Sequence, residues 1–112
     1  MTLVYKLLAD ADWRRARAAG VYEGSAADIA DGFIHLSARG QLAETAARHF
    51  RHAADLVVLE FESGDFGAAL RWSPSRGGDL FPHLHGPLDP ALVRRSWPAP
   101  LGDDGIPRVP AG

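Results

Sequence analysis

The stretch Asp31-Gly32-Phe33-Ile34-His35-Leu36-Ser37 marks the change from helix to strand that decides the predicted fold. Gly32 readily adopts the left-handed conformation in which many helices end, so it predicts the end of a short helix. The residues that follow alternate as they would in an extended strand. Ile34 and Leu36 then form a purely aliphatic face, which we expect to point into the core.

The other face of this predicted strand carries two groups capable of chemistry. His35 and Ser37 share it with Phe33, so an imidazole and a hydroxyl lie close together. Ser37 also precedes a helical pattern that begins near Arg39, which is typical of an N-cap residue. For His35 the structural alternative is a half-buried ring bonded to a carbonyl. Both residues therefore have a structural and a functional interpretation.

Outward from this stretch, hydrophobic periodicity predicts a chain of alternating strands and helices. Strands are expected over residues 3–8, 33–36, 56–62 and 92–97, with a further extended stretch over 80–85, and helices over 11–19, 26–31 and 39–51. The strand 56–62 begins with residues that are apolar on both faces, so it is expected in the centre of a sheet. Asp10 is predicted as an N-cap, and Ser25 with Asp28 as a capping box.

Length and proline content set the expected domain organisation. A chain of 112 residues is long enough for one hydrophobic core and one domain. From Pro98 onward the chain is rich in proline and glycine and shows no periodicity. We therefore expect a single α+β domain over residues 1–98 and a mobile tail over 99–112.

Composition excludes several classes of protein. The chain has no cysteine, so a disulfide framework, a thiol nucleophile and a thiolate zinc site are excluded. A net charge of −2 provides no overall attraction to nucleic acid, so a nucleic-acid partner is not expected. No apolar run approaches the roughly 20 residues that a membrane helix needs, and no signal peptide is seen, so a cytoplasmic protein is expected. The oligomeric state is left open.

Three histidines lie in strand-like segments beside loops, and they allow two kinds of site. His35, His83 and His85 could ligate zinc and leave one position for water, as in a metal-dependent hydrolase or lyase. Without metal, His35 and His83 could line a polar cleft and bind ribose hydroxyls or phosphate. Packing of the three rings at the margin of a sheet is the structural alternative.

Several short motifs together resemble a known family. They are Tyr5-Lys6, Gly20-Val21-Tyr22-Glu23-Gly24, Asp31-Gly32-Phe33-Ile34-His35-Leu36-Ser37, Ala46-Ala47-Arg48-His49-Phe50, Leu70-Arg71-Trp72, Ser75-Arg76-Gly77-Gly78 and Phe81-Pro82-His83-Leu84. In this order, and to about Trp97, they resemble the small bacterial family called domain of unknown function 952. That family is similar in fold to the ADP-ribosyltransferase superfamily, which includes RNA 2′-phosphotransferases.

The resemblance implies a fold and a ligand. The fold would be a bent and split mixed β-sheet flanked by helices, with a cleft that takes NAD. His35-Leu36-Ser37 resembles the second conserved element of the superfamily, whereas Tyr5-Lys6 departs from the His-Gly of the phosphotransferases. No glutamate matches the catalytic one of the ADP-ribosyl transferring members, and His83 occupies that region.

The resemblance also implies roles for individual residues. His35 and His83 are the expected catalytic residues, and Lys6, His35, Ser37, Arg71 and Arg76 are the expected contacts to NAD or to an ADP-ribosyl or phosphorylated nucleotide. No metal is expected, and zinc is the alternative. The activity would be that of an ADP-ribosyltransferase-like or 2′-phosphotransferase-like transferase. A ligand-binding or interaction module without turnover is the third hypothesis.

Overall fold

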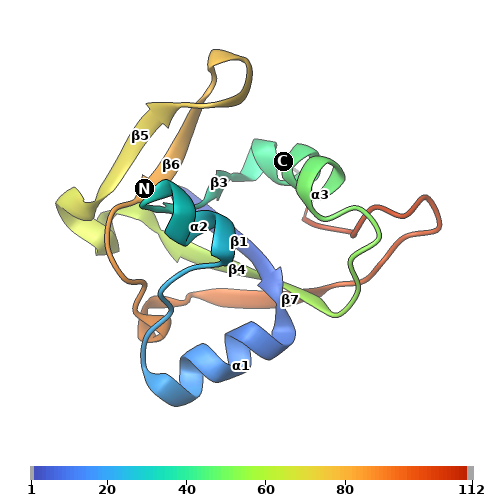
Figure 1. The fold of residues 1–112 in the computed structure, drawn as a ribbon, viewed down its shortest axis with the longest axis horizontal. Coiled ribbons are helices and arrows are strands. Elements are labelled where there is room, and N and C mark those ends of the chain that lie inside the picture. Colours follow the sequence, from blue (N-terminus) through green and yellow to red (C-terminus); the bar gives the residue numbers. More distant parts are fainter. Residues whose placement is uncertain (1, 111–112) are drawn as a thin grey trace.

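The computed structural model describes residues 2–110, apart from the side chain of Arg76, and shows a single α+β domain with two antiparallel sheets (Figure 1). The strands are β1 (Leu3–Ala9), β2 (Ile34–His35), β3 (Ser37–Ala38), β4 (Leu56–Glu62), β5 (Leu70–Pro74), β6 (Leu80–Leu84) and β7 (Arg95–Ala99). The α-helices are α1 (Asp10–Ala19), α2 (Ala26–Asp31) and α3 (Leu42–His49), and 3₁₀ turns cover Arg39–Gln41, Ser63–Ala69, Arg76–Gly78 and Pro90–Leu92. None of the described helices is long and apolar enough to cross a membrane.

The larger sheet has the strand order β3-β1-β4-β7 and carries a core on each face. β4 pairs with β1 along its whole length and with β7 on its other side, which confirms the central strand predicted from its continuous apolar run. Because side chains alternate along a strand, Val57 and Leu59 point to one face, and Leu56 and Val58 point to the other.

Helices cover both faces of this sheet. Trp13 and Ala16 of α1 belong to one buried cluster, which we call the α1-side core. Leu42 and Ala46 of α3 belong to the other, the α3-side core. The apolar spacing i, i+3 or i+4 on each helix places these residues on one side, as an amphipathic helix requires.

The smaller sheet has the order β2-β6-β5, and its β5–β6 hairpin extends away from the larger sheet (Figure 1). The segment Ile34–Ala38 joins the two sheets. Its first two residues pair with β6, and its last two pair with β1. Leu36, between them, donates its N–H to the carbonyl of Pro82 at 3.0 Å.

Two expectations about strands need correction here. The single strand predicted over 33–36 is instead a crossing segment shared by two sheets, because its two ends find different partners. The predicted mixed sheet is wrong, since every pairing between described strands is antiparallel. The predicted alternation is confirmed, because Ile34 and Leu36 are each 2% exposed in the α1-side core.

The predicted helix caps are partly confirmed. Ser25 and Asp28 form the expected capping box of α2, and Gly32 ends that helix at φ 86°. Asp10 is the first helical residue of α1, and the N-cap position is held by Ala9, which has no side chain able to cap. Ser37 is not a cap either, because it lies in β3, Ala38 holds the N-cap position, and the Ser37 hydroxyl faces that of Thr45.

Residues 99–110, predicted as part of a mobile tail, are packed onto the domain. Ala99 is 1% exposed at the end of β7, and Ile106 and Val109 lie against the α3-side core. A bridge between Leu101 and Pro107 closes the segment into a loop. Such a loop has no helical or strand periodicity, and for this reason the sequence pattern did not indicate its burial. Residues 111–112 lie outside the described residues.

The packing of this segment predicts a large effect of truncation. Ending the chain at Pro98 removes buried apolar surface worth at least about 3 kcal/mol. We expect the thermal midpoint to fall by at least about 10 °C, whereas a chain that ends at Pro110 should match the full chain. Equal midpoints for the two truncated chains in a calorimetric scan would show that residues 99–110 do not stabilise the domain.

Candidate functional site

The carboxylate of Asp28 is buried where α2, β1 and β2 meet. The residue is 2% exposed, and four hydrogen-bond donors surround its two oxygens. Oδ2 accepts from Lys6 Nζ at 3.0 Å and from the Ser25 amide at 2.9 Å. Oδ1 accepts from the His35 amide at 3.0 Å and lies 2.6 Å from His35 Nδ1. A buried carboxylate with this many donors is stable as an anion.

Lys6 is enclosed with Asp28, so its ammonium group points inward. It is 6% exposed, and besides the ion pair it donates to the carbonyl of His35 at 3.0 Å. The Lys6 ammonium group therefore does not point to solvent. Burial lowers the pKa of Lys6, and the charge of Asp28 opposes that change.

The surroundings of Asp28 act in opposite directions on its pKa. Burial raises it, but the charge of Lys6, the ring of His35 and the backbone amides of Ser25 and His35 lower it more. The result is a pKa of about 2. Asp28 is therefore a carboxylate at every physiological pH.

The ring of His35 lies between two carboxylates. Nδ1 faces Asp28 Oδ1 at 2.6 Å, and Nε2 faces Asp31 Oδ2 at 2.9 Å. A ring in this position bonds to both carboxylates only when each nitrogen carries a hydrogen. The side chain of His35 is 36% exposed, whereas Asp28 is enclosed, so the Nε2 side is the accessible side.

Strand pairing brings His35, His83 and Arg71 side by side. His35 of β2 pairs with His83 of β6, which pairs in turn with Arg71 of β5. Residues directly opposite each other across strands project from the same face of a sheet. We call these three residues the His–His–Arg row. Both predicted catalytic residues and a further predicted nucleotide contact, Arg71, thus lie together.

His83 is the buried member of the row. It is 5% exposed, and its ring nitrogens make no hydrogen bond within the described part of the chain. The Phe33 ring stacks on it with centroids 4.1 Å apart, and the His35 ring meets it edge-on at 5.8 Å. Burial lowers the pKa of His83, as do the nearby His35 and His85, while Asp31 raises it. His83 is thus uncharged at neutral pH.

The three histidines gather around Phe33 rather than around a common point for a metal. The Phe33 ring lies 4.7 Å from the His35 ring and 5.3 Å from the His85 ring, between centroids. Among residues 2–110, no group of three or more histidine, aspartate or glutamate side chains could hold a metal ion. The donor set therefore does not fit the zinc alternative in this arrangement.

Two other predicted ligand contacts, Ser37 and Arg76, are not members of the His–His–Arg row. Ser37 is 5% exposed, and its hydroxyl lies 3.0 Å from the hydroxyl of Thr45. The side chain of Arg76 lies outside the described residues. Sequence analysis assigned no site role to Asp28, Asp31 or Phe33. The capping box was the only signal at Asp28, and it concealed the second role of the same carboxylate.

A second buried carboxylate, Glu60, lies on the α3-side face of the larger sheet. It accepts from the Tyr5 hydroxyl at 2.9 Å and from Arg95 Nε at 3.2 Å. Burial raises the pKa of Tyr5, and the hydrogen bond to Glu60 raises it further. Both oxygens of Glu60 have partners, so this cluster is explained by the fold.

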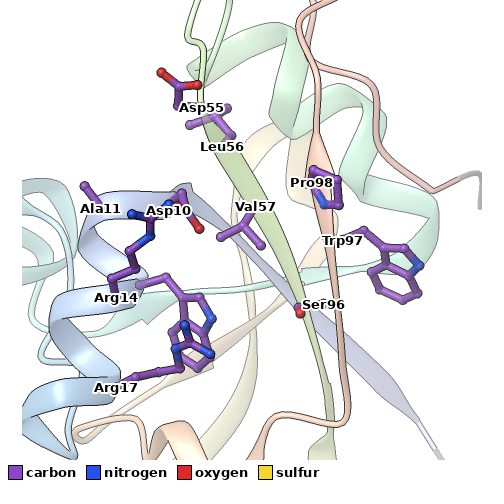
Figure 2. A pocket seen from close by; sticks show the side chains of 11 residues that line it. Asp10, Ala11, Arg14, Arg17, Asp55, Leu56, Val57, Ser96, Trp97 and Pro98 are labelled. Carbon is purple, nitrogen blue, oxygen red and sulfur yellow. Dashed lines mark ion pairs between the residues drawn. The ribbon is translucent and has the colours of Figure 1, made fainter.

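A hollow of about 630 Å³ lies between α1 and the β4–β7 edge (Figure 2). Arg14 and Arg17 extend from α1 toward it (Figure 2). Arg14 pairs with Asp10 at 2.6 Å, and Arg17 lies over the Trp13 ring. No member of the His–His–Arg row lines this hollow, so it is separate from the candidate site.

We predict that Asp28→Asn destabilises the fold, because it leaves the Lys6 ammonium buried without its counter-charge. The expected loss is about 3 kcal/mol in the free energy of unfolding. Adding Lys6→Met should recover part of it, since the unpaired charge is removed. Urea unfolding measures both variants, with the exposed Asp103→Asn as control. A loss no larger than that of the control would contradict this role of Asp28.

The low pKa of Asp28 predicts a specific dependence of stability on pH. The folded value of about 2 lies below the ordinary value of 3.8, so folding favours the anion. This contribution, about 2 kcal/mol, is present above pH 4 and is lost as the pH falls from 4 toward 2. Unfolding measured from pH 6 to pH 2 should show a loss that is smaller in Asp28→Asn. Parallel curves for the unmodified chain and Asp28→Asn would rule out this contribution of Asp28 to stability.

Comparisons with other proteins give the family of this chain. Residues 7–96 match the family model described as "Protein of unknown function (DUF952)". The crystal structure of protein CC0527 from Caulobacter crescentus is similar with a TM-score of 0.93 and 51% identity, over 96% of this chain and 94% of that one. The solution NMR structure of CC0527 gives a TM-score of 0.85 and 52% identity, over 96% and 92%. None of the curated proteins matches. The chain is therefore a member of the DUF952 family, as its motifs predicted.

Proposed function

We propose that this chain binds a nucleotide of the NAD or ADP-ribosyl class at the His–His–Arg row. The observation that carries the proposal is His83, which is 5% exposed and whose ring has no hydrogen-bond partner among the described residues. Buried polar groups in proteins are nearly always hydrogen-bonded. A bound ligand would supply the missing partner to the His83 ring through the part of the residue that stays exposed.

The chemistry of the row suits a ribosyl phosphate. A neutral imidazole both donates and accepts, which matches a ribose hydroxyl. Arg71 is exposed and makes no ion pair within residues 2–110, so its planar guanidinium can bind phosphate with two hydrogen bonds. Three neighbouring strands span about 10 Å from the first to the third. This length lets one ligand contact both the histidines and Arg71.

His35 and His83 are the groups proposed for the reacting centre. Asp28 fixes the orientation of His35 through Nδ1 and leaves Nε2 on the accessible side. His83 is uncharged at neutral pH because its pKa is lowered, so it can accept a proton. Two imidazoles side by side, one of them uncharged, fit transfer chemistry of the kind found in ADP-ribosyltransferases or RNA 2′-phosphotransferases, which this family resembles.

The remaining predicted contacts are Lys6, Ser37 and Arg76, and the proposal gives each of them a separate role. Lys6 acts through Asp28 and the carbonyl of His35, since its ammonium group is enclosed there. Ser37 is proposed to act through the hydroxyl of Thr45, which lies 3.0 Å from its own. Arg76 is kept as a proposed phosphate contact on the loop between β5 and β6.

Titration calorimetry with NAD, ADP-ribose and a 2′-phosphorylated nucleotide tests the proposal. Arg71→Gln should weaken binding by about tenfold or more, because it removes a charged hydrogen bond. His35→Gln should weaken it as well. Arg14→Gln and His49→Gln are the matched controls and should bind as the unmodified chain does. The proposal fails if none of the three ligands binds, or if Arg71→Gln binds as Arg14→Gln does.

Product analysis and thermal unfolding with zinc separate the alternatives. Binding of a nucleotide without any product on long incubation would identify a binding module that has no turnover. Stabilisation by zinc alone, lost in His85→Gln, would support the metal site instead of the nucleotide. Product formation that disappears in His35→Gln, with the fold intact, would support the transferase.

A further inference from the structure

The accessible nitrogen of His35 is occupied by a side chain of the protein itself. Asp31 Oδ2 lies 2.9 Å from His35 Nε2, and the Asp31 side chain is 55% exposed. The orientation of His35 does not depend on this contact, because Asp28 holds Nδ1 at 2.6 Å and is itself 2% exposed. The two carboxylates on the ring therefore differ, since one is enclosed and the other lies at the surface.

The position of Asp31 in its helix is electrostatically unfavourable. It is the last residue of α2, and a helix C-terminus carries a partial negative charge that favours cations over anions. Among the described residues its side chain has one polar partner, the His35 ring. No cap hydrogen bond or second ion pair explains an acid at this place, so the contact with His35 is its structural role.

The Asp31 side chain can move away from His35 Nε2. More than half of the Asp31 side chain already contacts solvent. A change of side-chain rotamer is therefore enough to free Nε2, and no movement of the helix is required.

We propose that Asp31 holds the place of a ligand phosphate, and that a phosphate oxygen displaces it from His35 Nε2 on binding. The identity of the ligand as a nucleotide rests on the proposed function, whereas the anion position itself rests on the contact between Asp31 and His35. The exchange replaces one anionic oxygen by another, so the hydrogen bond at Nε2 is kept. Asp31 thus sets the affinity of the site by competing with the ligand.

The charge balance of the row agrees with such an exchange. Burial, His35 and His85 all lower the pKa of His83, and Asp31 is the group that raises it. A phosphate bound at Nε2 would restore the negative charge that Asp31 takes away when it leaves. An apolar or cationic ligand would not restore this negative charge.

Titration calorimetry of Asp31→Ala with ADP-ribose and with inorganic pyrophosphate tests the inference. Because an exposed ion pair is weak, removing this competitor should tighten binding by roughly three- to tenfold. The exposed Asp103→Ala is the matched control and should bind as the unmodified chain does. In the double variant Asp31→Ala/His35→Gln the gain should disappear. Asp31→Asn, which keeps the shape and removes the charge, should show the same direction of change.

The two probes separate this inference from the proposed function. Equal or weaker binding of ADP-ribose to Asp31→Ala, with clear binding to the unmodified chain, would overturn the inference and leave the proposed function standing. Tighter pyrophosphate binding to Asp31→Ala without any ADP-ribose binding would support the anion position and overturn the nucleotide. Absence of binding for both probes in both proteins would overturn both.

Discussion

The buried carboxylate of Asp28 joins parts of the chain that are distant in sequence. Lys6 and His35 lie 22 and 7 residues from it, and the three residues come from β1, α2 and the crossing segment between the two sheets. Lys6 and Asp28 are both enclosed, so the attraction between them operates with little screening by water. Removing one partner would leave the other buried without compensation. The junction of the two sheets depends on this group.

The same interaction links the fold to the candidate site. Segment 34–38 leaves the smaller sheet and enters the larger one, and Asp28 accepts from the amide and contacts the ring of His35 at this crossing. The pairing of β2 with β6 then brings His83 beside that ring. A site on this face therefore has one imidazole fixed by a buried anion and a second one buried by packing against Phe33. Rigid support of this kind is what a binding or catalytic group requires.

Much of this arrangement follows from local sequence patterns. The alternation of Ile34 and Leu36, the capping box of α2 and the left-handed Gly32 depend on nearby residues, and a sequence shows nearby residues directly. Partners across strands are different, because nothing local indicates that His35 and His83 face each other. Asp28 has a local role and a long-range role, and only the local one leaves a pattern. The packing of residues 99–110 likewise depends on a surface formed by distant strands and α3.

A site-resolved NMR titration of the Asp28 side-chain carboxyl carbon tests the central claim most directly. The account attributes the position of His35, and with it the geometry of the row, to an anion held by Lys6, by His35 and by backbone amides. It predicts that this carboxyl titrates with a pKa of about 2 in the folded protein. A pKa near 4, the value of an ordinary exposed aspartate, would contradict the account. Asp28 would then not be held as an anion by these groups.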